Sequence, residues 1–468
     1  MSTPYWPARR WPFAAALLVI VALAAGRIWL IPAHYSTDPN EGWNAFQSAR
    51  VMGAGPLYPP PGGMTGNNYP PLSFFIAGGL GQLLGDHIVA GRILALLSVV
   101  ATAVLIAEIL RRLGAFRAAQ FGGALLFLFL NATLFRAYLA LDDPQWLGHA
   151  LMTAAIFVLV PASPTDPPRN ANVMLAALLM LAGGLIKQNL VAWPIAATLW
   201  LVRYHRRALV PWLVTGAVGG FLSILACRLA FGPDFLADTL GASRSYSLHR
   251  LARHAVAPLL VMLPMLVISR PLLERRAGDQ RLDLLIIVVL VAVPLGLFQR
   301  MGVGVDYNAH FEAAIALVLA CALAFDPVVK VHRWLAILFV SALLILGLRL
   351  TAREWVDMSA RRLAWTATEQ RVAAIPGRVA CQQPALCYWA GKPFALDFFL
   401  YGQRAIAERG TPLLDRALVE RRFAAAVLDP PRRVDAEHPA NPAIVRIEQA
   451  MRPVFIDNDG RRLMVPRQ

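Results

Sequence analysis

Apolar runs long enough to cross a bilayer recur along the first 350 residues of the chain. A helix of about 20 apolar residues spans the roughly 30 Å of hydrocarbon in a membrane. A shorter run at residues 71–84 begins next to two prolines, so we expect an interfacial or re-entrant helix there. The longer runs predict about eleven transmembrane helices, near residues 12–31, 91–110, 118–135, 144–161, 172–186, 189–202, 209–227, 254–269, 283–298, 309–325 and 333–350.

The first apolar run has two interpretations. Residues 22–24 resemble the cleavage site of a secretory signal peptide. The run continues past that site to residue 30, which favours an uncleaved membrane anchor.

The pattern changes after residue 350 to that of a soluble domain. Short strand-like runs alternate with helix-like stretches, and two closing strands flank the turn Asn458-Asp459-Gly460. We therefore expect a transmembrane domain over residues 1–350 and a small α/β domain over residues 351–468. The predicted strands are 378–381, 423–428, 453–456 and 462–465, and the predicted helices are 384–390, 401–422 and 441–451.

Composition and charge support a polytopic α-helical membrane protein. Hydrophobic residues make up 57% of the chain and charged residues 15%, whereas an ordinary soluble domain is about 25% charged. The net charge of +16 does not indicate a nucleic-acid partner, because the basic residues gather in short clusters between apolar runs, as topology signals do. These clusters are Arg9/Arg10, Arg111/Arg112/Arg117, Arg203/Arg206/Arg207, Arg270/Arg275/Arg276/Arg281 and Lys330/Arg333.

If the spans alternate in direction, all these clusters fall on one side of the membrane. The positive-inside rule makes that side cytoplasmic, so we expect a cytoplasmic N-terminus and an extracytoplasmic C-terminal domain. Most residues that suggest chemistry belong to the opposite loops. These loops are the first long loop (34–90), 136–143, 187–189, 228–253 and 299–308.

Asp38 and Glu41 open the first long loop, and their spacing fits two roles. Asp38 precedes Pro39 and a helix-like run, so it suits a helix N-cap with Glu41 at the third helical position. Alternatively, one of the two carboxylates is a general base that takes a proton from an acceptor hydroxyl. Spacing alone does not decide between these roles.

A second acidic pair, Asp142 and Asp143, precedes Pro144. Asp143 suits an N-cap with proline at the first helical position, and Asp142 is not needed for that cap. Asp142 and His149, seven residues later on nearly the same helical face, are therefore candidates for substrate binding, and Asp143 is a weaker one.

Basic side chains on the same side could bind a lipid-linked phosphate. Lys187 and Gln188 interrupt a strongly apolar region; the lysine either extends its ammonium to the membrane surface or faces an anion. A later basic group could clamp the same anion, or it could simply anchor its loop at the interface. This group comprises Arg244, Arg250, Arg253 and His254.

Polar residues gather again where the tenth predicted span begins. Ionisable groups at membrane depth are costly and usually face a cavity. We take the whole group as candidates for substrate binding, with mutual pairing of Glu312 and His310, or pairing to a neighbouring helix, as the alternative. The group is Asp306, Tyr307, Asn308, His310 and Glu312.

Two of the four cysteines, Cys381 and Cys387, belong to the C-terminal domain. An oxidising compartment would permit a disulfide between them, but their short spacing fits two separate thiols equally well. The sequence contains no spacing typical of metal ligands.

The order of the polar motifs resembles that of the GT-C glycosyltransferases, in the branch of protein O-mannosyltransferases and the lipid A aminoarabinose transferase. The resemblance covers most of residues 1–350. The motifs are Asp38-x-x-Glu41, Gly55-Pro56-Leu57-Tyr58, Tyr69-Pro70-Pro71-Leu72, Arg92 at the start of the next span, the Asp142-Asp143 pair, Lys187-Gln188 and Tyr307-Asn308.

This resemblance implies an inverting transfer of a sugar from a polyprenyl-phosphate carrier to an envelope lipid, glycan or protein, on the outer face of a bacterial inner membrane. The catalytic carboxylate of the family maps onto Asp38, and Tyr58 and Tyr69 become candidates for substrate binding. Glu41 replaces an acid that often follows directly, so the identity of the base stays open. No obligatory cofactor is implied, although Asp38, Glu41 and Asp142 could hold a divalent metal through water.

Two other classes of function fit the hydropathy. A secondary transporter or lipid flippase should show related halves and broken helices, and no such repeat is visible in the sequence. A non-catalytic scaffold of envelope assembly would use the C-terminal domain for docking. The oligomeric state is left open.

Overall fold

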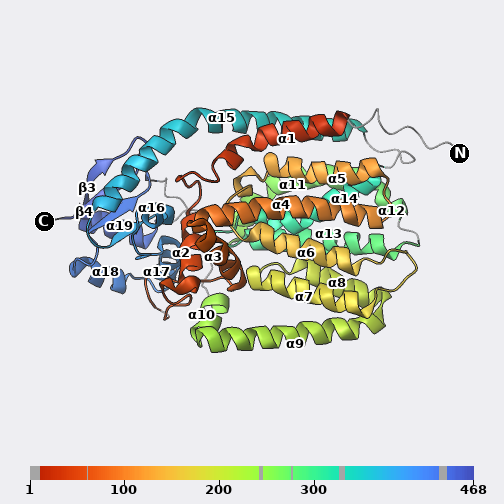
Figure 1. Ribbon diagram of the computed structural model, residues 1–468, viewed down its shortest axis with the longest axis horizontal. Coiled ribbons are helices and arrows are strands. Elements are labelled where there is room, and N and C mark those ends of the chain that lie inside the picture. The colour runs from red at the N-terminus through yellow and green to blue at the C-terminus, as the bar shows by residue number, and fades with distance from the viewer. Residues whose placement is uncertain are drawn as a thin grey trace.

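The protein consists of a bundle of long helices with a small α/β domain at one end (Figure 1). The computed structural model describes residues 11–60, 62–241, 246–275, 278–325, 333–431 and 440–467. We call the end of the bundle that touches the C-terminal domain the domain end.

A helix occupies each position where the sequence predicts a span. Among the described residues, seven helices are long and apolar enough to cross a membrane, namely α1, α4, α9, α11, α13, α15 and the continuous η4–α14 segment. The other four, α5 to α8, have 13 to 17 residues, or about 20–26 Å. The polytopic helical fold is confirmed; α5, α6 and α8 are shorter than their predicted spans, and α7 is slightly longer. The helices are α1 (Trp11–Trp29), α4 (His87–Arg112), α5 (Arg117–Ala132), α6 (Gln145–Leu159), α7 (Asn170–Ile186), α8 (Ala192–Tyr204), α9 (Arg206–Phe231), α11 (Leu248–Ser269), α13 (Gln280–Arg300), η4 (Tyr307–His310), α14 (Phe311–Ala324) and α15 (Arg333–Ala374).

The bundle is built around α14, in which every residue is buried. Helices α5, α11 and α13 pack against it. At the other extreme, α9 lies along the edge of the bundle and leaves most of its apolar side chains exposed (Figure 1). This contrast is expected when the outer helices face lipid.

Short helices gather at the domain end (Figure 1). In the first long loop, α2 (Pro39–Ala49) continues into one π-helical segment, η2 (Arg50–Ala54), and α3 (Leu72–Leu84) follows. Helix α3 is the short apolar helix predicted at 71–84, and it packs between α2 and α4. The remaining short elements of the bundle are η3 (Arg136–Tyr138), α10 (Asp234–Gly241) and α12 (Pro271–Arg275).

The C-terminal domain is a four-stranded sheet with helices, as predicted. The strands are ordered β1-β2-β4-β3; β1 and β2 are parallel, and β4 is antiparallel to both its neighbours. The predicted helix at 401–422 is wrong as a single element, because Pro412 starts a second helix. The strands are β1 (Val379–Cys381), β2 (Ala425–Leu428), β3 (Met451–Ile456) and β4 (Arg462–Pro466), and the helices are α16 (Pro384–Trp389), α17 (Phe398–Ala407), α18 (Pro412–Val419) and α19 (Pro442–Ala450).

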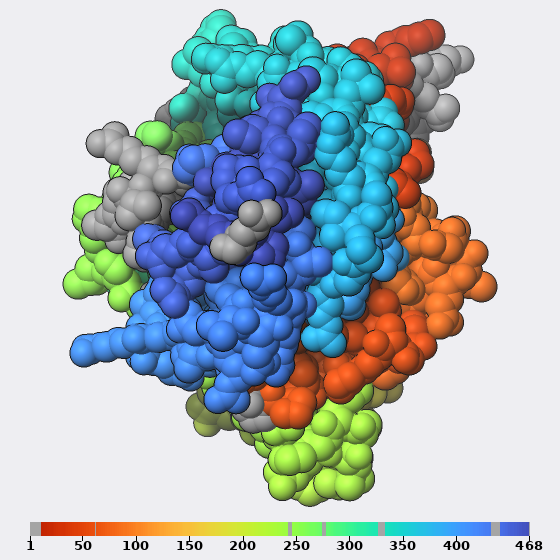
Figure 2. Space-filling view, turned by 90° about the vertical axis from the view of Figure 1, so that its left-hand side faces the viewer, coloured from red at the N-terminus to blue at the C-terminus, as the bar shows by residue number. Residues whose placement is uncertain are grey.

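The two domains are joined by one continuous helix. The expected boundary at residue 350 lies inside α15, whose 42 residues run from the bundle into the C-terminal domain. Figure 2 looks onto the domain end, where the C-terminal domain covers the centre of the face and α15 runs beside it. The ends of α4, α8, α11 and α12 and the starts of α5, α9, α13 and α15, which carry the described members of the arginine clusters, lie at the opposite end (Figure 1). Arg9, Arg10, Arg276 and Lys330 lie outside the described residues.

Candidate active site

Asp38 sits at the first turn of α2, with its side chain partly exposed at the domain end. The backbone N–H of Asn40 donates a 2.8 Å hydrogen bond to Asp38 Oδ1, and Pro39 is the first helical residue. The predicted N-cap is therefore confirmed. The cap fixes the direction of the carboxylate, so capping and a chemical role are compatible in this residue.

Carboxylates from three separate segments surround this position. Burial raises the pKa of Asp38 to about 6, against the hydrogen bond from Asn40, which lowers it. The negative charges of Asp143, Glu41 and Asp306 raise this pKa further. A carboxylate with a pKa in this range is basic enough to accept a proton and still ionised near neutral pH.

Glu41 is buried and fully engaged by Arg92 of α4. Arg92 Nε lies 2.6 Å from Glu41 Oε1, and its Nη2 lies 2.9 Å from Oε2. The same guanidinium donates to the carbonyls of Leu30, Ala33 and Tyr35, which follow α1. Glu41 therefore anchors α2 to the bundle, and of the two acids only Asp38 reaches solvent.

Asp143 lies just before α6 and pairs with the predicted cation Lys187. The Gln145 backbone N–H donates a 2.8 Å hydrogen bond to Asp143 Oδ1, but α6 begins at Gln145 with Pro144 at its N-cap position, so the predicted cap is displaced by one residue. Lys187 Nζ lies 3.3 Å from that oxygen and 4.8 Å from the centre of the Tyr69 ring. Lys187 is only 4% exposed, so the alternative in which its ammonium reaches the membrane surface is wrong.

The environment keeps Lys187 protonated. Burial alone would lower its pKa, but the charge of Asp143 and the hydroxyl of Tyr69 raise the pKa above its ordinary value. Gln188 next to it donates to the carbonyls of Asn68, at 2.7 Å, and Thr239, at 3.3 Å. Gln188 thus ties the first long loop to α10.

Asp142 is buried, as Asp143 is. Its backbone carbonyl accepts a 2.7 Å hydrogen bond from Asn44 Nδ2, and its side chain lies directly against Gly91 of α4. Burial and the nearby charge of Glu41 raise the pKa of Asp142 well above its usual range. This shift favours the protonated form of the Asp142 carboxyl.

The two tyrosines of the first long loop have different surroundings. Tyr58 is buried, donates from its hydroxyl to the Tyr69 carbonyl at 2.7 Å, and packs on Phe231 and Phe235. Tyr69 presents its ring to Lys187. Tyr58 holds the loop in place, and only Tyr69 faces a charged group of the site.

The segment 306–310 carries a charged pair at its start. Asp306, whose side chain is half exposed, pairs with Arg300 at 3.2 Å, and the Arg300 guanidinium lies 5.1 Å from the centre of the Tyr307 ring. Asn308 Nδ2 donates to Gln145 Oε1 at 3.3 Å. Gln145 Nε2 is in turn 2.8 Å from Nε2 of His149, which is buried inside the bundle.

Glu312 and His310 do not pair with each other. The Glu312 carboxylate accepts hydrogen bonds from the backbone N–H groups of Ala192, at 3.4 Å, and Trp193, at 3.2 Å, at the start of α8. The pairing of Glu312 to a neighbouring helix is therefore correct. His310 is buried against Gly296 and lines an apolar cavity between α5, α11 and α14.

The basic group predicted to bind phosphate lies partly within the structure. Arg244 is outside the described residues, while Arg250, Arg253 and His254 occupy the first turns of α11. Just before them, the Ser247 backbone N–H donates to the Met301 carbonyl at 3.1 Å. The start of α11 therefore lies beside the loop that leads to Asp306.

The C-terminal domain contacts α2 directly. Trp43 Nε1 donates a 2.9 Å hydrogen bond to Asp397, and a Cβ on Gly42 would lie 1.9 Å from the Ala385 nitrogen of α16. Cys381 and Cys387 form a disulfide between β1 and α16, which settles the question that the sequence left open. The domain thus helps to fix the helix that begins at Asp38.

Some of these contacts involve residues that the sequence did not single out as site residues. Asn44 and Ser48 share one face of α2 with Glu41, but a polar face alone does not indicate burial. An arginine near the start of an apolar span, such as Arg92, does signal a buried partner. In the part of the chain that the structure describes, no three His, Cys, Asp or Glu side chains are grouped to hold a metal ion.

Comparison with known proteins places this arrangement in a known fold. No protein-family model and no curated protein sequence match the chain. The structure matches ArnT from Cupriavidus metallidurans in the apo state with a TM-score of 0.66 and 13% identity, over 98% of each chain. It matches the same protein bound to undecaprenyl phosphate with a TM-score of 0.61 and 13% identity, over 96% of each chain. The chain therefore shares the fold of ArnT over nearly its whole length, including the C-terminal domain.

Proposed function

We propose that the protein is an inverting glycosyltransferase. It moves a sugar from a polyprenyl-phosphate donor to an envelope lipid, glycan or protein on the periplasmic face of a bacterial inner membrane. The observation that carries this proposal is Asp38, a partly exposed carboxyl with a pKa of about 6, held at a helix start in an ArnT-like fold. One of the matched structures contains undecaprenyl phosphate, which supports the class of donor.

The distribution of basic residues supports a periplasmic location of the reaction. The arginine clusters lie at the end of the bundle opposite the site, and arginine-rich loops favour the cytoplasm (Figure 1). The site then faces a compartment without nucleotide sugars, whereas a sugar phosphate on an isoprenoid lipid can arrive through the bilayer. A lipid-borne donor is the class that this location favours.

The proposed step is a single displacement. Asp38 accepts the proton of an acceptor hydroxyl as that oxygen attacks the anomeric carbon of the donor sugar. The bond from the anomeric carbon to the phosphate oxygen breaks, and its electron pair leaves with the phosphate. Attack opposite the leaving group inverts the configuration at the anomeric carbon.

Lys187 is our candidate for stabilising the departing phosphate. Its ammonium is buried and protonated, and a buried cation interacts with developing negative charge more strongly than one in water. Asp143 and Tyr69 hold it in position before the donor arrives. Arg250 and Arg253 at the start of α11 are further candidates for the same role.

Analysis of lipids from cells that lack the protein tests the proposal. We expect a polyprenyl-phospho-sugar to accumulate and one sugar to be missing from an envelope glycan, lipid or protein. In addition, purified protein should release polyprenyl phosphate only when an acceptor is present. Release without an acceptor, or no change in either lipid pool, would contradict transfer.

A further inference from the structure

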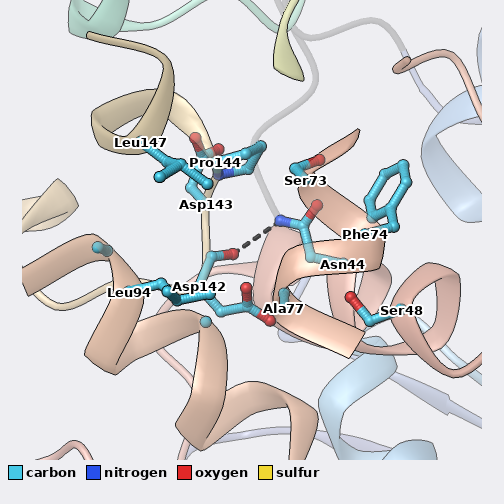
Figure 3. Close-up of a pocket in the computed structure, with 12 residues that line it drawn as sticks. Asn44, Ser48, Ser73, Phe74, Ala77, Leu94, Asp142, Asp143, Pro144 and Leu147 are labelled. Atoms are coloured by element: carbon cyan, nitrogen blue, oxygen red, sulfur yellow. Dashed lines mark hydrogen bonds between the residues drawn. The ribbon is translucent and has the colours of Figure 1, made fainter. Parts of the chain in front are cut away.

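A partly polar pocket lies between α2, α3, α4 and the start of α6 (Figure 3). Four buried side chains line it, each at most 4% exposed. Each of them has one oxygen without a hydrogen-bond partner among the residues that the structure describes. These oxygens are Asn44 Oδ1, Ser48 Oγ, Ser73 Oγ and Asp142 Oδ2.

Such a group of unpaired oxygens is unusual, because about nine in ten buried polar atoms are hydrogen-bonded. Three different segments of the chain contribute them, so one irregular turn does not explain the group. The Asn44 amide is already used, since its Nδ2 donates to the Asp142 carbonyl. The pocket therefore offers one acceptor, two hydroxyl groups and one carboxyl oxygen to a ligand.

The residues that line the pocket favour an uncharged group over an anion. No lysine or arginine is among them, and Arg92 beside the pocket is paired with Glu41. Asp142 Oδ2 is buried without a partner among the described residues, and burial raises the pKa of this carboxyl, which favours the protonated form that can donate a hydrogen bond. A positively charged amine gains little there, whereas hydroxyl groups, which donate and accept, match every open position.

We propose that Asn44, Ser48, Ser73 and Asp142 bind the hydroxyl groups of a neutral sugar, namely the sugar of the lipid-linked donor. This proposal rests on the proposed function and adds the chemical class of the sugar. Apart from Asp143, which pairs with Lys187, the remaining wall of the pocket is apolar and includes Ala77 of α3, Leu94 of α4 and Leu147 of α6 (Figure 3). An apolar wall made by bundle helices favours a ligand that arrives with a lipid over a soluble acceptor.

Binding to the full-length protein in lipid nanodiscs tests this assignment. The probes are undecaprenyl phosphate alone, its glucose and mannose conjugates, and a conjugate of an aminopentose. We expect at least one neutral conjugate to bind the wild type about tenfold more tightly than the bare lipid phosphate and more tightly than the amino conjugate. Ser48→Ala and Ser73→Ala should each weaken binding of that neutral conjugate about fivefold and leave binding of the bare lipid phosphate unchanged.

Thermal unfolding separates a ligand site from a structural role. Removing an oxygen that has no partner in the protein should not lower the unfolding midpoint of the unliganded variants. Ser98→Ala is the matched control, because Ser98 donates to its own helix at the Leu94 carbonyl, and we expect unchanged binding of all probes. A lower midpoint in Ser48→Ala and Ser73→Ala without ligand would overturn the assignment.

The outcomes also distinguish failure of the pocket from failure of the function. If the wild type binds undecaprenyl phosphate but neither neutral conjugate binds better, the pocket assignment is overturned and the proposed function stands. The pocket assignment is also overturned if Ser48→Ala and Ser73→Ala weaken binding of the bare and the conjugated lipid equally. The same holds if they weaken binding only of a soluble glycan acceptor. If the wild type binds no polyprenyl phosphate, both proposals fall.

Discussion

Arg92 holds Glu41 through two short charge-assisted hydrogen bonds, of 2.6 and 2.9 Å, inside the protein. This pair joins α2, whose N-cap is Asp38, to α4, which carries Arg92. Since both oxygens of Glu41 are occupied, the pair also explains how two nearby acids have different roles. Glu41 positions the helix, and Asp38 remains able to exchange protons.

Breaking this ion pair should destabilise the protein strongly. Arg92→Met leaves Glu41 charged and buried, which costs about 3–5 kcal/mol. We expect a lower thermal unfolding midpoint and reduced amounts of folded protein in the membrane. The double variant Glu41→Leu/Arg92→Met should recover much of the midpoint, because it removes both charges. An unchanged midpoint in Arg92→Met would show that the pair does not anchor α2.

The activity should depend on pH through Asp38. Its pKa is raised to about 6, so the fold favours the protonated form, and the stability this contributes at low pH is lost as pH rises through about 6. Catalysis has the opposite dependence, because the base must be ionised. We expect kcat/KM to be constant above about pH 7 and to fall about tenfold per pH unit below 6. A flat profile down to pH 5 would argue against this base.

Gly91 should be essential to the position of Asp142. A Cβ at residue 91 would lie 1.8 Å from Asp142 Oδ1, so Gly91→Ala must displace that side chain. Overpacking of this kind costs about 1–3 kcal/mol, and we expect a larger relative loss of turnover than of stability. Gly122→Ala on α5 is the matched control, since its Cβ would meet nothing within 4 Å. Equal effects of the two substitutions would contradict this packing.

The contact between the C-terminal domain and α2 should matter for turnover. Trp43→Phe removes the 2.9 Å hydrogen bond to the buried Asp397 and should cost about 1–3 kcal/mol. We expect a lower unfolding midpoint and slower transfer, measured together on purified protein. Trp334→Phe, at an exposed position of α15, should leave both quantities near wild type. If Trp43→Phe behaves like this control, the domain does not support the site through Trp43.

Local sequence patterns predicted much of the fold but little of the side-chain pairing. Apolar runs located the helices, and the strands, the Asn458-Asp459-Gly460 turn and the Asp38 cap follow from short-range rules. Pairs such as Glu41 with Arg92 join residues far apart in sequence. Glu312 and the start of α8 are likewise distant. Such pairs form when whole helices pack together. Short-range patterns in a single sequence do not show which distant residues this packing brings into contact.

The same limit applies to burial. Lys187 stands at the end of an apolar run, where either exposure or burial satisfies the hydropathy pattern. Its burial depends on Asp143 and Tyr69, which come from two other loops. The sequence therefore predicted which residues are chemically suggestive, and the fold decides which of them meet.

The central claim is that Asp38 is the base in sugar transfer, and Asp38→Asn tests it most directly. Asparagine caps helices as well as aspartate does, so this variant keeps the start of α2 while it removes the base. Asp166→Asn, in an exposed loop at the opposite end, is the control. The measurement is the rate of transfer from a polyprenyl-phospho-sugar by purified protein, compared at equal unfolding midpoints. We predict a loss of about 100-fold or more in Asp38→Asn and none in Asp166→Asn; near-normal transfer by Asp38→Asn would contradict the account.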